Sequence, residues 1–511
     1  MRAELPSIMP TLTSSIMTEL RQLLVEVGDG GQVGPSSYDT AQLLRYAPPQ
    51  QDLEGAYGWL LTQQQGDGGW GEPGHPLYRD VPTAAAILAL HARDHGARHR
   101  SAIAAGIEFL NGQDALWQAP LAEDIPIGIE LILPRLLVEA NAVGLALPAK
   151  QYDALVQLGE KKLALLRQAT LPVGSPPLHS WEAWGGNPSV AMLDRGGSVG
   201  ISPSATAAWL YAARHAGIDA ALIANAEHYL EQASAGTGVE IAGVVPNVWP
   251  IDVFEPSWIL HTLALGDVLQ HTELAAEVMR IVTSLRGAID EKGLGAAVNF
   301  APDGDDTAVV MSVLAMTGHV LPYNPLHHFA LGNLFLTYPG ERNPALSTTI
   351  HAVHALRLIG ESIEAGEAYL EQSRDDDGVW SGEKWHASWL YPTSQAIAAL
   401  GHGRPAWSDE RALAGVLAQQ HACGGWGAGD MPTFEETAYA VLSLHMLSSP
   451  HNPARVIADA MGKAYQWMLG AYVPYARPIR ALWIGKELYC PRRVVRVVEL
   501  VGLLVASRWS L

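Results

Sequence analysis

The stretch Pro302-Asp303-Gly304-Asp305-Asp306-Thr307-Ala308 places three carboxylates within four positions, directly before the apolar run 309–316 (VVMSVLAM). This run predicts a buried helix. Charges that enter an apolar interior cost several kcal/mol each unless they are paired or neutralised, and neighbouring carboxylates cannot all ionise. We therefore expect at least one of the three acids to keep its proton while it faces an apolar space.

A second interpretation of the same stretch is structural. Asp303 is suited to cap the predicted helix, and Asp305 and Asp306 would favour its positive N-terminal end. The spacing alone leaves both interpretations open.

The composition indicates a packed, acidic protein. Of 511 residues, 48% are hydrophobic and 16% are charged, so most of the chain should be packed rather than disordered. The net charge of −20 argues against nucleic acid as a partner. The two cysteines, Cys423 and Cys490, exclude a disulfide framework and a thiolate metal site. The N-terminus lacks a signal-peptide core and no apolar run reaches transmembrane length, so we expect a cytoplasmic protein.

A repeated theme predicts the fold: an apolar helix, then Gln, a Gly/Asp turn and Trp. Copies occur at 59–71 and 416–427, and a looser one at 369–380. Gln can bond the free end of a helix, Gly makes the sharp turn and Trp packs beneath it, so we interpret the copies as structural. Their irregular spacing favours helical hairpins that close into α-barrels. Strand signals are weak, and we expect an all-α fold.

Two further stretches help to place the chain. The pattern at 12–27 predicts an amphipathic helix. The Pro-rich passage 245–255 (VPNVWPIDVFE) predicts a crossing between two barrels.

The motif Asp-x-Asp-Asp-Thr-Ala at 303–308, together with the Gln…Gly-x-Trp turns, resembles the class II terpene cyclases, which include squalene–hopene cyclases and diterpene cyclases. Further stretches resemble copalyl diphosphate synthases, most closely the ent-copalyl diphosphate synthases of plant-associated bacteria that make gibberellin precursors. These stretches are 35–41 (PSSYDTA), 178–182 (LHSWE), 202–207 (SPSATA), 245–255 (VPNVWPIDVFE) and 483–489 (WIGKELY).

The resemblance runs from about residue 20 to 505 and implies a layout. Two α/α-barrels would enclose the active site between them, in the βγ arrangement of class II cyclases. The β domain, with the acid motif, would comprise 1–30 plus 240–511, and the γ domain would be the insert 31–239.

The resemblance also implies the chemistry. Asp305 would protonate the terminal double bond of geranylgeranyl diphosphate, with Asp303 and Asp306 holding it in place. After two rings form, His179 and Asn247 would hold a water molecule that removes a proton. Without the resemblance, the preferred interpretation of His179 would be a buried histidine whose hydrogen bonds are satisfied.

Cations and aromatic rings complete the implied site. The family grips the diphosphate with lysines, which here match Lys486 and, upstream, Lys162 with Arg167 as a neighbour. Trp249 is the candidate aromatic contact to substrate, and further candidate lining residues are Trp258, Trp385 and Trp389.

Mg²⁺ is expected as the companion of the diphosphate. Its ligands are unknown from the sequence, and Asp80 and Glu130 are the only carboxylates that we can suggest.

The product is expected to keep its diphosphate. The segment 375–379 (DDDGV) lacks the final acid of an Asp-Asp-x-x-Asp motif. A separate class I diterpene synthase, such as an ent-kaurene synthase, would then act on the product. The alternatives are another labdane, halimane or clerodane diphosphate as product, a less favoured cyclisation of squalene, and a non-catalytic α-barrel that binds isoprenoids.

Overall fold

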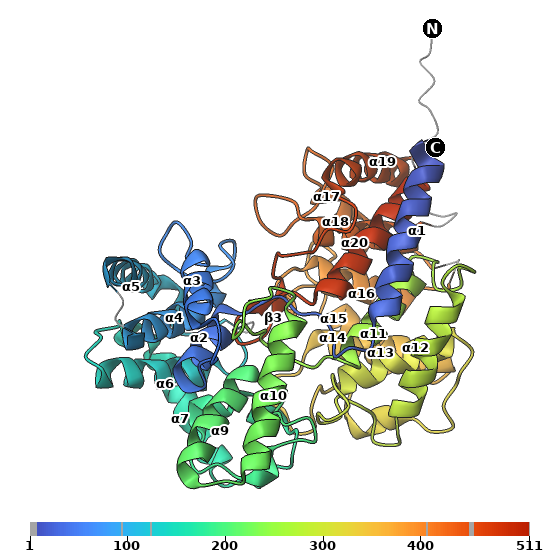
Figure 1. Cartoon of the computed structure of the whole chain (residues 1–511). Coiled ribbons are helices and arrows are strands. Elements are labelled where there is room, and N and C mark those ends of the chain that lie inside the picture. Colours follow the sequence, from blue (N-terminus) through green and yellow to red (C-terminus); the bar gives the residue numbers. More distant parts are fainter. Residues whose placement is uncertain (1–7, 94–95, 123–124, 405–406, 449–453, 510–511) are drawn as a thin grey trace.

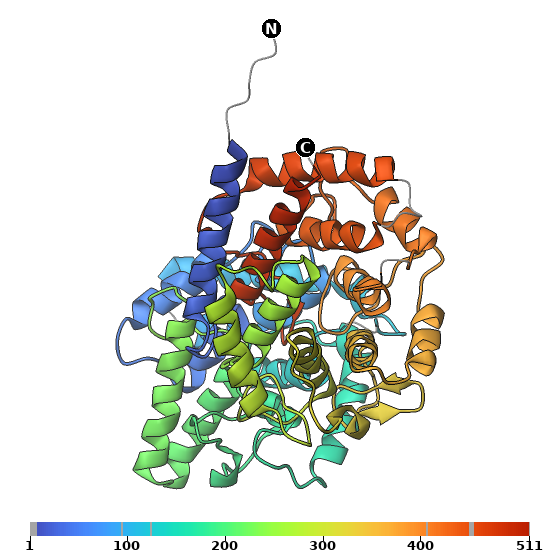
Figure 2. The same cartoon turned by 90° about the vertical axis from the view of Figure 1, so that its right-hand side faces the viewer.

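The computed structural model describes residues 8–93, 96–122, 125–404, 407–448 and 454–509, and its helices form two bodies joined side by side (Figure 1). Helix α1 packs on the body that also holds the C-terminal helix α20 (Figure 2). Within the described ranges, the strands are two short antiparallel pairs, so the predicted all-α class is confirmed. The strands are β1 Ala330–Leu331, β2 Leu334–Phe335, β3 Trp483–Ile484 and β4 Leu488–Tyr489.

The first body is a ring of helices built from the N-terminal part of the chain. Helices α2, α4, α6, α8 and α9 contact one another in turn, and α9 closes the ring on α2, with α3, α5, α7 and α10 outside it. The bounds are α2 Ser37–Tyr46, α3 Leu53–Thr62, α4 Asp80–Arg93, α5 Gly96–Asn111, α6 Ile129–Ala142, α7 Asp153–Leu166, α8 Trp181–Trp184, α9 Pro203–Ala216 and α10 Ala220–Gly236.

The second body is a larger ring. Helices α11, α13, α14, α16, α18 and α20 contact one another in turn and close on α11, with α1, α12, α15, α17 and α19 outside. Every residue of α11 is buried, which is why its sequence has no polar face. The bounds are α1 Ile8–Glu26, α11 Phe254–Leu265, α12 Ala275–Ala288, α13 Gly304–Met316, α14 Leu346–Ile359, α15 Glu364–Gln372, α16 Leu390–Gly401, α17 Glu410–Ala418, α18 Phe434–Leu447, α19 Ala454–Ala471 and α20 Arg492–Ser507.

The hydrophobic cores follow the same division. One core draws on 16–33 and 251–506, and two further clusters draw on 38–249. We call the first body the smaller barrel and the second body the larger barrel. The chain passes between them within the predicted crossing, since Trp249 belongs to the core of the smaller barrel and Ile251 to the core of the larger barrel. The limits 1–30 plus 240–511 and 31–239 stay a prediction. No helix in the described ranges has the length and apolar character needed to cross a membrane.

The Trp of each repeated turn fastens the end of a helix. In Trp70, Trp380 and Trp426, the fully buried indole Nε1 donates to a backbone carbonyl ten residues earlier, at 2.7 to 2.8 Å. Each bond satisfies one of the carbonyls that the end of an α-helix leaves without a partner.

The Gln of the turn joins neighbouring helices. Gln64 and Gln420 each donate from Nε2 to a carbonyl of the next outer helix, at 2.8 and 3.0 Å. In the looser copy, Arg374 takes this position, and its guanidinium lies 4.2 Å from the ring centre of Trp380. Gly424 has φ +102°, and a Cβ there would lie 2.5 Å from the carbonyl oxygen of Lys463, so the turn requires glycine.

Replacing Trp426 with Phe is expected to lower the free energy of unfolding by about 2–4 kcal/mol, because it leaves a void and an unpaired buried carbonyl. The measurement is the denaturant midpoint, followed by circular dichroism. Trp59→Phe is the matched control, since Trp59 is only half-buried on the outer helix α3. Equal midpoints for the two variants would contradict the fastening role.

Candidate active site

The three acids lie at the N-terminus of the inner helix α13. Asp303 is the N-cap, and its Oδ1 accepts the backbone N–H of Asp306 at 2.7 Å. Only glycine fits at position 304, because a Cβ there would lie 2.4 Å from the carbonyl oxygen of Leu336. The side chains of Asp303, Asp305 and Asp306 are nevertheless buried, with exposed fractions of 2, 8 and 5%. Both interpretations of the motif therefore hold, since it caps the helix and buries the acids.

Burial keeps protons on this triplet. It raises the pKa of Asp306 well above the usual range, with the neighbouring Asp303 adding to the effect, and it raises the pKa of Asp303 to about 7. In the described structure, Oδ1 of Asp306 has no hydrogen-bond partner. At neutral pH the triplet thus retains a proton, held by its flanking members. The role of Asp305 as the donor stays a prediction.

Asp305 has a partner that the sequence did not reveal. Nδ1 of His351, on α14, lies 2.6 Å from Oδ1 of Asp305, and both side chains are buried. Nε2 of His351 lies 3.4 Å from Oε1 of Gln395, and in the tautomer or charge state with a hydrogen on Nδ1 the ring donates to Asp305 and stabilises its carboxylate. One signal was available, because His351 and His354 are two polar residues one turn apart in the otherwise apolar stretch 350–356 (IHAVHAL) of α14.

The triplet faces a cavity of about 160 Å³ where the two barrels meet. His179 and Ile201 come from the smaller barrel, Asn247 from the crossing segment and the acids from the larger barrel. The lining contains no Lys or Arg. Seven aromatic side chains contribute to the wall: Phe254, Trp258, Phe300, Tyr338, Trp385, Trp483 and Tyr489.

The environment of His179 fixes its charge and its tautomer. Nδ1 lies 2.8 Å from the carbonyl oxygen of Gly200, which can only accept, so Nδ1 carries the hydrogen and Nε2 keeps its lone pair. Burial, aided by the charge of Lys486, lowers the pKa of His179 to about 3. This pKa is well below the value of 6.5 for a free histidine, so the side chain is a neutral hydrogen-bond acceptor at the cavity wall.

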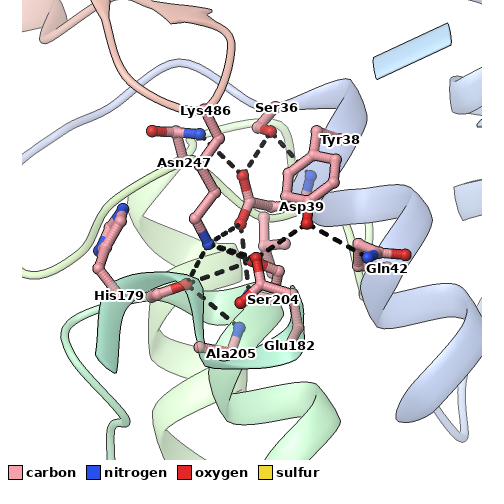
Figure 3. Close-up of polar contacts among 12 residues, drawn as sticks. Ser36, Tyr38, Asp39, Gln42, His179, Glu182, Ser204, Ala205, Asn247 and Lys486 are labelled. Atoms are coloured by element: carbon pink, nitrogen blue, oxygen red, sulfur yellow. Dashed lines mark hydrogen bonds and ion pairs between the residues drawn. The ribbon is translucent and has the colours of Figure 1, made fainter. Parts of the chain in front are cut away.

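Asn247 is oriented as firmly as His179. Its Nδ2 donates to Oδ2 of Asp39 at 3.0 Å (Figure 3). Its Oδ1 therefore points the other way, toward Gly485, where an added Cβ would lie 2.0 Å from this oxygen. Since Asn247 and Gly485 both line the cavity, the pair His179–Asn247 presents two hydrogen-bond acceptors.

Lys486 does not line the cavity, and its contact with diphosphate stays a prediction. Its side chain is fully buried behind the cavity wall, and Nζ donates to Glu182, Ser202 and Ser204 at 2.6 to 2.8 Å (Figure 3). These bonds use all three hydrogens of the ammonium group. A second carboxylate, that of Asp39, lies 3.7 Å away. Lys486 instead holds together the polar network that orients Asn247.

The other predicted contacts to substrate also lie outside the cavity lining. Lys162 is exposed on α7 and pairs with Glu130, while Arg167 is exposed at the C-cap of the same helix. Trp249 packs in the core of the smaller barrel, where its indole donates to the carbonyl of Gly31 at 3.2 Å. Trp249 therefore does not line this cavity, and its role as a substrate contact stays a prediction.

The remaining tryptophans divide between wall and core. Trp258 and Trp385 line the cavity as expected, whereas Trp389 packs against the core of the larger barrel. Sequence reasoning missed Trp483, although the stretch that contains it carried part of the resemblance.

The two suggested carboxylates do not fit a magnesium site. Oδ2 of Asp80 accepts from Trp117 and Tyr152 at 2.5 and 2.9 Å, and burial raises its pKa to about 7. Glu130 pairs with Lys162, and neither acid lines the cavity. The described residues contain no group of three or more His, Cys, Asp or Glu side chains that could hold a metal ion. The need for Mg²⁺ stays a prediction.

Two closed α-barrels with a buried acid triplet at their junction define the class II terpene cyclases. Comparison with known proteins supports the same class. The chain is 36% identical to the (+)-kolavenyl diphosphate synthase of Herpetosiphon aurantiacus over 98% of its length and 99% of the relative. It is 49% identical to the protein y4kT of Sinorhizobium fredii over 98% of both chains. Its fold matches the ent-copalyl diphosphate synthase of Streptomyces platensis with a TM-score of 0.80, at 30% identity, over 96% of this chain and 99% of that one.

The protein therefore belongs to the family of class II diterpene cyclases and is an enzyme of that family. No protein-family profile matches the chain.

Raising the pH through about 7 is expected to slow cyclisation, because Asp303 ionises there and its charge strengthens the hold of the neighbouring carboxyls on their protons. In Asp303→Asn the position stays neutral and still caps the helix, so the decline should move to higher pH. The measurement is kcat against pH with geranylgeranyl diphosphate. An unchanged decline in the variant would assign it to another group.

Proposed function

We propose that the protein is an ent-copalyl diphosphate synthase, which cyclises geranylgeranyl diphosphate to ent-copalyl diphosphate and leaves the diphosphate in place. One observation carries the proposal: a single aromatic cavity is lined both by the acid triplet and by the neutral pair His179–Asn247. The acid triplet supplies a proton, and the pair His179–Asn247 receives one through a water molecule.

The reaction begins when Asp305 protonates the terminal double bond. An alkene is a very weak base, so the products of this step need stabilisation. At about 4 Å and an effective dielectric constant near 20, the new carbocation and the carboxylate attract each other by roughly 4 kcal/mol. The hydrogen bond from His351 further stabilises the carboxylate.

The aromatic wall serves the positive charge as it moves. The faces of Trp258, Trp385 and Trp483 can each add about 1–2 kcal/mol to the stability of a desolvated cation. Because these rings are weakly polar, they stabilise the cation without capturing it.

The reaction ends at the pair His179–Asn247. A water molecule that donates one hydrogen to Nε2 of His179 and the other to Oδ1 of Asn247 turns its oxygen lone pair toward the substrate. This water then takes the proton from the bicyclic cation. A carbocation is so strong an acid that a histidine with a pKa of about 3 is sufficient to assist, and this low pKa keeps the histidine unprotonated beforehand.

A second candidate is a cyclase that gives a rearranged clerodane diphosphate, because a relative at 36% identity is a (+)-kolavenyl diphosphate synthase. Rearrangement requires the bicyclic cation to survive longer before it loses a proton. The oriented pair His179–Asn247 favours prompt removal, and it is our reason for preferring the ent-copalyl product. That product would pass to a separate class I diterpene synthase, such as an ent-kaurene synthase in gibberellin biosynthesis.

Incubation with geranylgeranyl diphosphate and Mg²⁺, followed by phosphatase treatment and chiral gas chromatography, is expected to give ent-copalol. Asp305→Asn should abolish turnover without changing the circular dichroism spectrum, since an amide cannot donate the proton. A kolavenol-type alcohol would support the second candidate. An active Asp305→Asn variant would remove this residue as the acid.

His179→Ala is expected to shift the product toward a hydroxylated diphosphate, because the water loses one of the two acceptors that orient it and can add to the cation. The measurement is the ratio of hydroxylated to unsaturated alcohol by gas chromatography with mass spectrometry. His215→Ala, an exposed histidine on α9, is the control. The same ratio in both variants would argue against the base assignment.

A further inference from the structure

A row of four histidines leads away from the acid, and none of the four lines the cavity. His351, bonded to Asp305, meets His261 edge to face with 5.9 Å between ring centres. Nε2 of His261 lies 3.2 Å from Nδ1 of His354. His354 in turn meets His402 edge to face at 5.7 Å. The first three are at most 2% exposed, whereas His402, at the C-cap of α16, is half-buried and marks the outer end of the row.

This row is costly for the stability of the barrel. Burial lowers the pKa of His261 and of His354 well below the usual value, so both rings are neutral. Within the described chain, Nε2 of His354 and Nδ1 of His402 are buried without a hydrogen-bond partner. A buried polar group without a hydrogen bond destabilises the folded state. None of these three histidines lines the cavity, so contact with substrate does not explain them.

The proposed function supplies the reason for such a row. In each turnover Asp305 loses a proton to the substrate, and a different proton leaves at His179–Asn247. The acid must then be reloaded. A chain of water molecules through the cavity would do this, but any water beyond the one held by His179–Asn247 could add to the carbocation and end the reaction early. The new proton therefore has to arrive from behind the acid.

We propose that His402, His354, His261 and His351 form a proton path from solvent to Asp305. A solvent proton binds His402, and each neutral imidazole takes a proton on one nitrogen and releases the proton of the other. His351 finally delivers its Nδ1 proton to Oδ1 of Asp305 and restores the carboxylic acid. One proton enters here for each proton that leaves on the base side, so the overall reaction remains an isomerisation.

The existing geometry sets how each transfer occurs. The transfer between His354 and His261, and that between His351 and Asp305, follow hydrogen bonds already present. The two transfers between rings in edge-to-face contact need a ring rotation or one inserted water to bring nitrogen to nitrogen. Ring rotation also restores the starting tautomers. The low pKa values make a protonated ring short-lived, so the path passes protons without storing charge beside the substrate.

The test rests on the proposed function and follows deuterium into the product. Enzyme in H₂O is first saturated with an analogue of geranylgeranyl diphosphate whose terminal double bond is saturated, which fills the cavity without reacting. It is then diluted into D₂O for increasing times, chased with excess geranylgeranyl diphosphate and quenched after one turnover. The fraction of product that is one mass unit heavier reports the exchange of the Asp305 proton while the cavity is closed to water.

His354→Gln keeps a hydrogen bond to His261 but cannot relay a proton. We expect this variant to slow the exchange and the steady-state rate at least about tenfold, while the first turnover of protonated enzyme keeps its rate. His386→Gln is the matched control, because His386 is buried in the same barrel outside the row. Exchange in His354→Gln as fast as in the unmodified enzyme would overturn the path.

A variant at the outer end covers the case in which His354→Gln does not fold. His402→Ala should slow the exchange in the same way, and added imidazole should restore it, because a small diffusible base can replace the half-buried ring. Normal exchange in His402→Ala, or no effect of imidazole on slowed exchange, would overturn the path. A second control uses enzyme without the analogue, kept in D₂O for a long time before substrate is added. A product without deuterium from this enzyme would instead overturn the proposed protonation by Asp305.

Discussion

The cost in free energy of burying ionisable groups away from water determines which side chains in this site are charged and which partners they have. The acid triplet and Lys486 are buried where the two barrels meet, and His179 lies half-buried beside them in the cavity wall. None of them could keep its usual charge there without a partner. The motif at 303–306 meets this constraint by retaining protons, and Lys486 meets it by pairing with carboxylates. The charge states of the site therefore follow from proton retention by the triplet and from ion pairing by Lys486.

The network around Lys486 shows how one buried cation can organise a distant group. Asp39 belongs to α2, Glu182 to α8 and Lys486 to the turn between β3 and β4, so the ion pairs join segments that are far apart in the sequence (Figure 3). Removing the ammonium would leave two carboxylates unpaired in the interior, which is strongly destabilising. Because Asp39 also accepts the amide of Asn247, the network that joins the barrels also aims the acceptor at the cavity.

Features encoded by local spacing could be predicted from the sequence. The structural role of the turns around Trp70 and Trp426 could be inferred, since helix, Gln, Gly and Trp all lie within about a dozen residues. The bonding differs from the expected one, because the Trp indole bonds the helix end and Gln bonds the neighbouring helix. The acid motif was recognisable for the same reason. The surroundings of Lys486 and Trp249 could not be inferred in this way, because the side-chain hydrogen-bond partners of each lie more than 200 residues away. The apolar residues beside Lys486 in the sequence, such as Trp483 and Ile484, do not show which charges the lysine meets.

Acid and base can share one cavity because burial acts on them in opposite directions. Loss of water disfavours the charged form of every group, so it raises the pKa of a carboxyl and lowers the pKa of an imidazole. Asp306 and Asp303 therefore hold protons, while His179 stays unprotonated. A solution containing the same groups would transfer the proton from acid to base and leave both inactive. In the dry cavity that transfer would create two unsolvated charges, so the triplet keeps its proton and His179 stays neutral.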